Sequence, residues 1–404
     1  MIVNVNYNNY NEKHFLYSYP KIKQKYCSKN YEQNEQNSKI SEDKIICRLK
    51  TESNVKAYNN NFKNGISHQL NNKQPKKEVS QNGLNNYEYP LIILINVGNT
   101  TYITTVIRCF SDIFSKYYLD NINIITNNIT KMPLSFFYTE ILFNLFPKQG
   151  THLNTWYSLD KFYNALIYLN PIFKGKSTKN ANDFLIYFIN ELSKENKVIL
   201  NNNIQNGNIK IDEEFSWVSK KIEKCLACGK ESITISKYLT YDLDFGNALN
   251  KAIFNNKNKL SLFNCIKYSL EKIYRYNIFC FNCNKKDNFE RTSSIENSSN
   301  NLIFLNRIEN TEIINKIKNT NFKFQINNII DLSKVIKNNS NSVYHLNGVV
   351  LYNSQNLEYI AYSYNSFHKK WYKYEKDNII PIEFNIFDYE YDYKLFPVIF
   401  FMKK

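Results

Sequence analysis

The spacing of apolar residues divides the chain into a polar N-terminal part, a helical part and a part rich in strands. Residues 1–86 are polar and irregular, as in EQNEQNSKISEDK, and contain too few periodic apolar residues to bury a core. We therefore expect a disordered or weakly ordered tail, and leave open that it acts as a targeting or partner-binding segment. An ordered domain is expected over 87–404.

Apolar residues recur at helical spacing in the first half of this domain. Val106 and Phe110 lie on one face of a helix expected over 101–118. Asn99 or Thr100 is a suitable N-cap for that helix. The same spacing predicts further helices over 134–146, 158–169, 180–195 and 261–273.

Apolar and polar residues alternate in the second half, which is the pattern of half-buried strands. Strands are expected over 232–245, 302–308, 321–326, 343–352, 357–364, 370–375 and 395–401. Helices that come first and antiparallel strands that come later predict an α+β domain with a groove between its halves.

Composition excludes some classes of partner. The formal charge is +16, from 52 Lys and Arg against 36 Asp and Glu, but the basic residues are spread along the chain without a localised stripe. We therefore do not expect nucleic-acid binding. No apolar run reaches the roughly 18 residues that span a bilayer, so no membrane association is expected. The first residues lack the pattern of a secretion signal, which favours a cytoplasmic or nuclear location.

Four of the eight cysteines form two Cys-x-x-Cys pairs, CLAC with Cys225 and Cys228, and CFNC with Cys280 and Cys283. Four thiolates at this spacing are typical of tetrahedral zinc, and four protein ligands leave no open position on the metal. We therefore expect structural zinc that holds two distant hairpin ends together. Four buried thiols without a metal are the alternative.

The stretch LINVGNTTY at 94–102 lies between an apolar run and a helical segment, where an enzyme would place a nucleophile. It resembles the first box of the ubiquitin-specific proteases, Leu-x-Asn-x-Gly-Asn-Thr-Cys-Tyr, at every fixed position but one. Thr101 stands where that family has its nucleophilic cysteine. The resemblance implies that Asn96 is the residue that helps to bind the oxyanion. Thr101 as an ordinary helix-start residue is the alternative, which the matching flanks disfavour.

Further boxes of that family follow in order, and the resemblance covers roughly 89–402. NANDFL resembles a helical box whose acids hold the basic tail of ubiquitin, with Asn180 replacing one acid and Asp183 replacing the other. NLIFLNRIE at 301–309 resembles a strand that reads Leu-x-x-x-Leu-Lys-Arg-Phe in the family.

The last box of the family is also present, but its catalytic residues are changed. It is carried by YHLNGVV, LEYIAYSY and WYKYEKD at 344–350, 357–364 and 371–377. Glu358 stands where the family has its catalytic histidine, and Leu357 replaces the glycine before it. Glu375 stands where the family has the Asp or Asn that orients the histidine. Tyr359 is retained and is expected to line the channel for the ubiquitin tail.

The resemblance implies a papain-like fold with a helical thumb, an antiparallel β palm and zinc-braced β fingers at about 213–310. It also implies a hydrolase of ubiquitin C-terminal bonds, but the substitutions disfavour that chemistry. A threonine hydroxyl needs a base, and a carboxylate is a poor one because its pKa in model peptides is about 4.3. Losing one nucleophile or base in a triad can cost about 10⁶ in rate. Two neighbouring carboxylates could raise one pKa, so residual acid–base function stays open.

Other thiols and imidazoles do not occupy the family positions. Cys109 lies on the core face of its helix, as Cys265 does on another, and His345 and His368 lie elsewhere in the last box. We therefore interpret the chain as a catalytically inactive relative that binds ubiquitin or a ubiquitinated protein. The alternatives are an active deubiquitinase with unusual chemistry and a scaffold that has lost ubiquitin, for example in RNA processing.

Overall fold

The computed structural model describes residues 91–146, 155–175, 179–201, 211–307, 311–337, 342–366, 368–382, 390–392 and 394–404. The prediction of a disordered tail over 1–86 lies outside the described residues, which all belong to the unit Tyr87–Lys404. Within the described part, no helix combines the length and the apolar character needed to span a bilayer.

The first half of the described unit is helical, as the apolar spacing predicts. Its helices are α3 (Thr101–Phe114), α4 (Lys116–Asp120), α5 (Ile122–Asn127), α6 (Pro133–Leu145), α7 (Asp160–Leu169), α8 (Ala181–Asn201) and the short α9 (Ile211–Glu214), with a 3₁₀ turn at Pro171–Phe173. The helix expected over 101–118 is divided at Ser115 into α3 and α4. Thr100 precedes α3, but its hydroxyl accepts the Val97 N–H at 2.9 Å and so closes the preceding turn.

The palm sheet is the larger of the sheets and carries most of the predicted strands. Eight described strands form it: β5 (Tyr241–Leu243), β9 (Asn301–Asn306), β11 (Ile329–Asp331), β12 (Val343–Asn353), β13 (Glu358–Asn365), β14 (Lys370–Glu375), β15 (Asn378–Pro381) and β17 (Leu395–Lys403). Their order is β15-β14-β13-β12-β17-β9-β5, and β11 pairs with β12. All pairs are antiparallel except β5 with β9.

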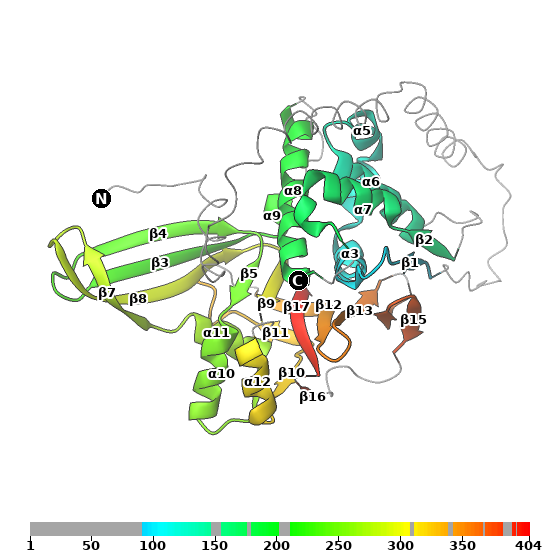
Figure 1. Ribbon diagram of the computed structural model, residues 1–404. Helices are drawn as coiled ribbons and strands as arrows, with labels where there is room; N and C mark the ends of the chain where they lie inside the picture. Colours follow the sequence, from blue (N-terminus) through cyan, green and yellow to red (C-terminus); the bar gives the residue numbers. More distant parts are fainter. Residues whose placement is uncertain are drawn as a thin grey trace, which may run out of the picture. The chain divides into compact units, whose positions relative to one another are not determined.

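The fingers sheet consists of β3 (Trp217–Cys225), β4 (Glu231–Tyr238), β7 (Ile273–Cys280) and β8 (Lys285–Ser298), in the antiparallel order β4-β3-β8-β7. It lies on the other side of α8 from α6 and α7 (Figure 1). The remaining elements are β1 (Ile93–Ile95), β2 (Trp156–Ser158), β6 (Lys259–Ser261), β10 (Lys323–Gln325), β16 (Glu390–Tyr391), α10 (Phe245–Phe254), α11 (Leu262–Ser269) and α12 (Thr311–Asn319).

Two predicted elements around the fingers sheet have different bounds in the structure. The strand expected over 232–245 is interrupted between β4 and β5, and Asp244 then caps α10 by accepting the Asn247 N–H at 3.1 Å. The helix expected over 261–273 is α11, which begins at a capping box of Ser261 and Asn264 and ends before β7.

Helix α3 is buried almost all round because it packs between the palm sheet and the other helices. Gly348 on β12 permits the close approach, since a Cβ there would lie 3.1 Å from both Cβ and Sγ of Cys109. On the opposite side, the Phe110 ring lies 5.5 Å from the Phe188 ring of α8 and 5.9 Å from the Tyr138 ring of α6. This packing holds the N-terminus of α3 against the start of β13.

Candidate functional site

The site begins where α3 starts, at the position that the first sequence box assigns to a nucleophile. Thr101 is the first residue of α3 and only 4% exposed. Its hydroxyl accepts the backbone N–H of Tyr359 at 3.2 Å, which joins the start of α3 to the start of β13. The fold therefore brings Thr101 next to the Glu358–Tyr359 segment, as the family boxes imply.

Asn96 lies in the turn before α3. The Thr104 hydroxyl donates to Asn96 Oδ1 at 3.0 Å, which orients the carboxamide with Nδ2 as its remaining hydrogen-bond donor. An amide donor at a helix start is the kind of group that stabilises a carbonyl oxygen. The side chain is thus oriented as a candidate carbonyl-binding group, although a nucleophilic thiol does not stand beside it.

Glu358 and Glu375, the two acids at the positions that the sequence boxes assign to the histidine and its orienting residue, each pair with a lysine. Glu358 Oε1 lies 3.2 Å from the Lys376 ammonium, and Glu375 Oε2 lies 2.7 Å from that of Lys373. Lys376 follows β14 in the turn that leads to β15, with a left-handed φ of 52°. Each of the two carboxylates is therefore held in an ion pair with a lysine.

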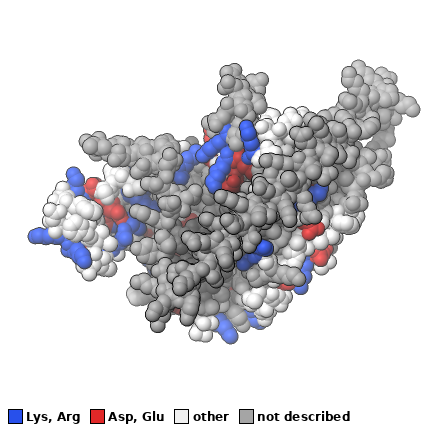
Figure 2. All heavy atoms as spheres, turned by 45° about the horizontal axis from the view of Figure 1, so that its top comes forward, with Lys and Arg blue, Asp and Glu red and all other residues white. Residues whose placement is uncertain are grey.

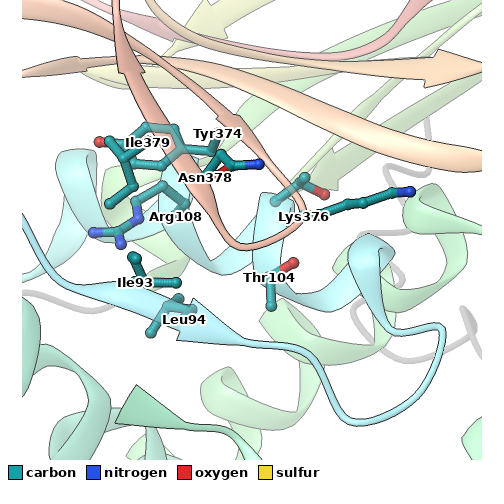
Figure 3. Close-up of a pocket in the computed structure, with 9 residues that line it drawn as sticks. Ile93, Leu94, Thr104, Arg108, Tyr374, Lys376, Asn378 and Ile379 are labelled. Carbon is teal, nitrogen blue, oxygen red and sulfur yellow. The ribbon is translucent and has the colours of Figure 1, made fainter. Parts of the chain in front are cut away.

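A small pocket lies beside this ion pair, between α3, β1 and the β14–β15 turn (Figure 3). The Arg108 guanidinium lies 4.6 Å from the centroid of the Tyr374 ring and donates to the carbonyl oxygen of Ile92. Lys376 contributes a second cation to the lining. The lining residues are Ile93, Leu94, Thr104, Thr105, Arg108, Tyr374, Lys376, Asn378 and Ile379, which include neither a thiol nor an imidazole.

The thiol and imidazoles considered as substitutes lie away from Thr101. Cys109 is two turns further along α3, about 12 Å from Thr101 at 1.5 Å per residue. Burial raises its pKa well above the ordinary value. His345 lies on β12, where its strand partners are Ile329 of β11 and Lys403 of β17. His368 lies beyond the end of β13, and its Nδ1 is 3.0 Å from Tyr372 Oη. At 3.3 Å per strand residue, both imidazoles are on the order of 25 Å from Glu358.

The N-terminus of α8 meets the same region and contains the residues expected to hold the ubiquitin tail. The Ala181 N–H donates to Tyr359 Oη at 3.3 Å, so Tyr359 links β13 to α8. Asn180 Oδ1 accepts the N–H groups of Asn182 at 2.7 Å and Asp183 at 3.2 Å. Asn180 therefore acts as the N-cap of α8, a structural role that its Asn type also explains.

An ion-pair network that sequence reasoning missed surrounds Asp183. Asp183 Oδ1 lies 3.1 Å from Nη1 of Arg307, whose Nε lies 3.5 Å from Asp242 Oδ1. Arg307 directly follows β9 and belongs to the stretch NLIFLNRIE, which resembles a strand of the family. The motif alone gave no signal for this contact, because the three residues meet only through the packing of α8 on the palm sheet.

The four cysteines of the Cys-x-x-Cys pairs meet at the tip of the fingers sheet. Their Sγ atoms all lie within 4.8 Å of one another, and Cys228 Sγ is 3.7 Å from Cys280 Sγ. A tetrahedral zinc with bonds of about 2.3 Å requires sulfur–sulfur distances of about 3.8 Å. Left-handed residues, Gly229 at 69° and Asn284 at 53°, close the two turns. The four thiols therefore fit a zinc site.

The described surface carries basic residues in several places. In the view of Figure 2, blue side chains are scattered and are interrupted by acidic and neutral ones, with some at the far left, where the fingers sheet ends. Exposed lysines near the cysteine cluster include Lys224, Lys230, Lys285 and Lys286.

Comparisons with known proteins agree with the fold and the order of the sequence boxes. The family model for ubiquitin carboxyl-terminal hydrolase matches residues 92–396. The chain is similar in structure to the SAGA Ubp8/Sgf11/Sus1/Sgf73 DUB module bound to ubiquitin aldehyde, with a TM-score of 0.59, 17% identity, and coverage of 78% of this chain and 69% of that chain. The same module with a Ubp8 variant, bound to monoubiquitin, gives a TM-score of 0.57 with the same identity and coverages.

A search among curated proteins gave no matching relative. At 17% identity, the structural similarity shows the fold alone. The family match, by contrast, covers more than half of the chain. It agrees with the predicted papain-like α+β architecture, in which a helical layer, an antiparallel palm sheet and a cysteine-tipped fingers sheet are all found. The chain therefore belongs to the ubiquitin carboxyl-terminal hydrolase family and is a ubiquitin-specific protease by fold.

Proposed function

We propose that this protein is a pseudo-deubiquitinase, which binds ubiquitin or a ubiquitinated partner through the surface around α3, β13 and α8 without cutting it. One observation carries the proposal. A buried threonine that accepts a backbone N–H occupies the nucleophile position, and Glu358, paired with Lys376, occupies the base position beside it.

The chemistry of these groups supports inactivity. Peptide-bond cleavage would require Thr101 Oγ1 to lose its proton to a base during attack, and the leaving amine would then require a proton from an acid. A carboxylate engaged by an ammonium is badly suited to both steps. Cys109 lies more than 10 Å from the nucleophile position, and His345 and His368 lie more than 10 Å from the base position. These residues are therefore too far away to serve as a replacement nucleophile and base.

Two features support retention of ubiquitin binding. Tyr359, Asn96 and Asp183 keep the residue types or charge that the family uses along the ubiquitin tail, and Tyr359 ties two elements of the site together. Both similar structures contain Ubp8 bound to ubiquitin or ubiquitin aldehyde. Ubiquitin recognition also uses a surface much larger than a catalytic trio, so it can survive the loss of that trio.

Zinc at the fingertip belongs to the same proposal. Cys225, Cys228, Cys280 and Cys283 would hold the ion, which supplies four strong bonds between β3–β4 and β7–β8 and no open position for catalysis. Because the two Cys-x-x-Cys turns lie at the ends of different hairpins, the ion would keep the fingers sheet from separating at its tip.

Binding and turnover measured on one preparation test the proposal. We expect heat of binding on titration with ubiquitin at micromolar concentrations, and no release of fluorophore from a ubiquitin C-terminal amide above that of Thr101→Ala. Turnover that disappears in Thr101→Ala would instead establish an active enzyme. Absence of binding up to high micromolar ubiquitin, in a protein shown to be folded, would favour a scaffold that no longer recognises ubiquitin.

A further inference from the structure

Arg307 pairs with Asp183, the acid that the proposed function assigns to the basic tail of ubiquitin. Its Nη1 lies 3.1 Å from Asp183 Oδ1, and its Nε lies 3.5 Å from Asp242 Oδ1. The side chains of Arg307, Asp183 and Asp242 are 44%, 49% and 58% exposed, so a ligand can reach all three. A guanidinium of the protein thus sits where a guanidinium of the ligand is expected.

The backbone on both sides of this contact is firmly held. Asn182 Nδ2 donates to the carbonyl oxygen of Asn306 at 3.4 Å, and Asn306 Nδ2 donates to the carbonyl oxygen of Pro397 at 3.1 Å. Asn182 and Asn306, the sequence neighbours of Asp183 and Arg307, are both fully buried. Arg307 can therefore leave Asp183 only by a change of its side-chain rotamer, not by movement of α8 away from β9.

The charges of the three residues leave room for a second cation. Two carboxylates share a single guanidinium, so the network carries one net negative charge. If an arginine of a ligand forms an ion pair with Asp183, Arg307 can keep its contact with Asp242. Each carboxylate then has its own guanidinium. A guanidinium can form two parallel bonds to one carboxylate, which makes this exchange geometrically favourable.

We infer that Arg307 is a built-in competitor at the tail-binding acid and that Asp242 sets how strongly it competes. The inference rests on the proposed function, because it concerns the site that would hold the ubiquitin tail. Asp242 draws Arg307 away from Asp183 and so favours the ligand. Loss of Arg307 removes both its competition for Asp183 and its repulsion of an arginine of the ligand. Loss of Asp242 leaves Asp183 as the acid with which Arg307 pairs in this network, so Arg307 competes more strongly.

The test compares Arg307→Gln, Asp242→Asn and the double variant by titration with ubiquitin and with ubiquitin truncated before its basic C-terminal tail. Because exposed ion pairs contribute up to about 1 kcal/mol, we expect Arg307→Gln to bind full-length ubiquitin about three- to fivefold more tightly. Asp242→Asn should bind about two- to threefold more weakly, on the same argument. In the Arg307→Gln background, Asp242→Asn should have a smaller effect, since it acts through Arg307.

Lys194→Gln provides the matched control. Lys194 lies on the same helix as Asp183, pairs with Glu191 at 3.0 Å, and its loss changes the net charge equally. It should leave ubiquitin affinity unchanged, and none of the variants should alter binding of the truncated ubiquitin.

The outcomes separate the inference from the proposed function. If wild type binds ubiquitin through the tail but Arg307→Gln binds no more tightly, or Lys194→Gln gains as much, the competitor role is refuted. If no variant binds full-length ubiquitin, or truncation of the tail changes nothing, tail recognition itself is refuted. If Arg307→Gln binds where wild type does not, both ideas are supported, with the competition stronger than expected.

Discussion

Leu357 has a backbone conformation that side-chain-bearing residues rarely adopt. Its φ is 56°, and it immediately precedes Glu358 at the start of β13. The related proteases have a glycine here, for which a left-handed conformation is free of steric cost. The turn therefore has a shape that suits a glycine although a leucine stands there, and some backbone strain is expected.

Replacing Leu357 by glycine is expected to stabilise the fold. The left-handed conformation costs a residue with a Cβ about 1–2 kcal/mol, and the extra freedom of glycine in the unfolded chain offsets part of that gain. Since the Leu357 side chain is 56% exposed, little burial is lost. Urea denaturation should show a gain of about 0.5–1 kcal/mol in the free energy of unfolding. Leu357→Ala, which keeps a Cβ, should give no gain, and a loss in the glycine variant would contradict the strain argument.

The site could be predicted from the sequence only as far as its motifs reach. The boxes around Thr101 and Glu358 identified the two positions, because the residues that surround a catalytic centre recur in fixed order along the chain. The partners that engage those groups were not predictable. Lys376 reaches Glu358 from the turn after β14, and Arg307 reaches Asp183 from the end of β9. Both contacts depend on strand register and helix packing.

The fingers sheet is less buried than the palm sheet, whose strands β9 and β13 are buried along most of their length. Its strands are mostly half-buried or exposed, as in β4 and β7, so it buries little apolar surface of its own. The same lack of a buried face explains why alternation did not predict β3, β7 and β8. Sheets of this kind need a further constraint, and four thiolates on one ion would supply it.

Removal of one zinc ligand should therefore unfold the fingertip. We expect wild-type protein to contain one zinc per chain by mass spectrometry or atomic absorption, and Cys228→Ser to lose at least tenfold in zinc affinity. Limited proteolysis should then cut the variant between β3 and β4 or between β7 and β8. Cys265→Ala, which removes a buried thiol outside the cluster, should keep its zinc. Wild-type protein that is resistant to proteolysis after complete zinc removal would contradict the role of the ion.

The helical layer is joined by a buried carboxylate that bears on the stability of the entire domain. Glu195 of α8 is only 4% exposed and accepts the N–H groups of Leu134 at 3.0 Å and Ser135 at 2.7 Å, at the start of α6. Burial raises the pKa of Glu195 from 4.5 to about 7, outweighing the two backbone hydrogen bonds, which lower it. The folded state therefore binds the proton of this carboxyl more tightly than the unfolded state does.

This shift predicts that stability falls as the pH rises. The contribution of Glu195 is fully present below pH 4.5 and is lost between pH 4.5 and about 7, as the buried carboxyl ionises. Over this pH range the free energy of unfolding is expected to fall by about 3 kcal/mol, at 1.36 kcal/mol per pH unit. Glu195→Gln should flatten this part of the stability profile measured by denaturation at several pH values, whereas Glu231→Gln, at an exposed position, should not. An unchanged profile in Glu195→Gln would refute the assignment.

The amino-acid sequence determined the class of fold, most helices of the first half, most strands of the palm sheet, the cysteine set and the two positions that match the catalytic boxes of the family. These depend on periodicity and on short motifs, which are local properties of a chain. The folded structure alone decided how those positions are used: that Thr101 accepts the Tyr359 N–H, that Glu358 is held by Lys376, and that Arg307 lies on Asp183. Such contacts join residues far apart in the chain, so they arise only when packing and strand register bring them within hydrogen-bonding distance.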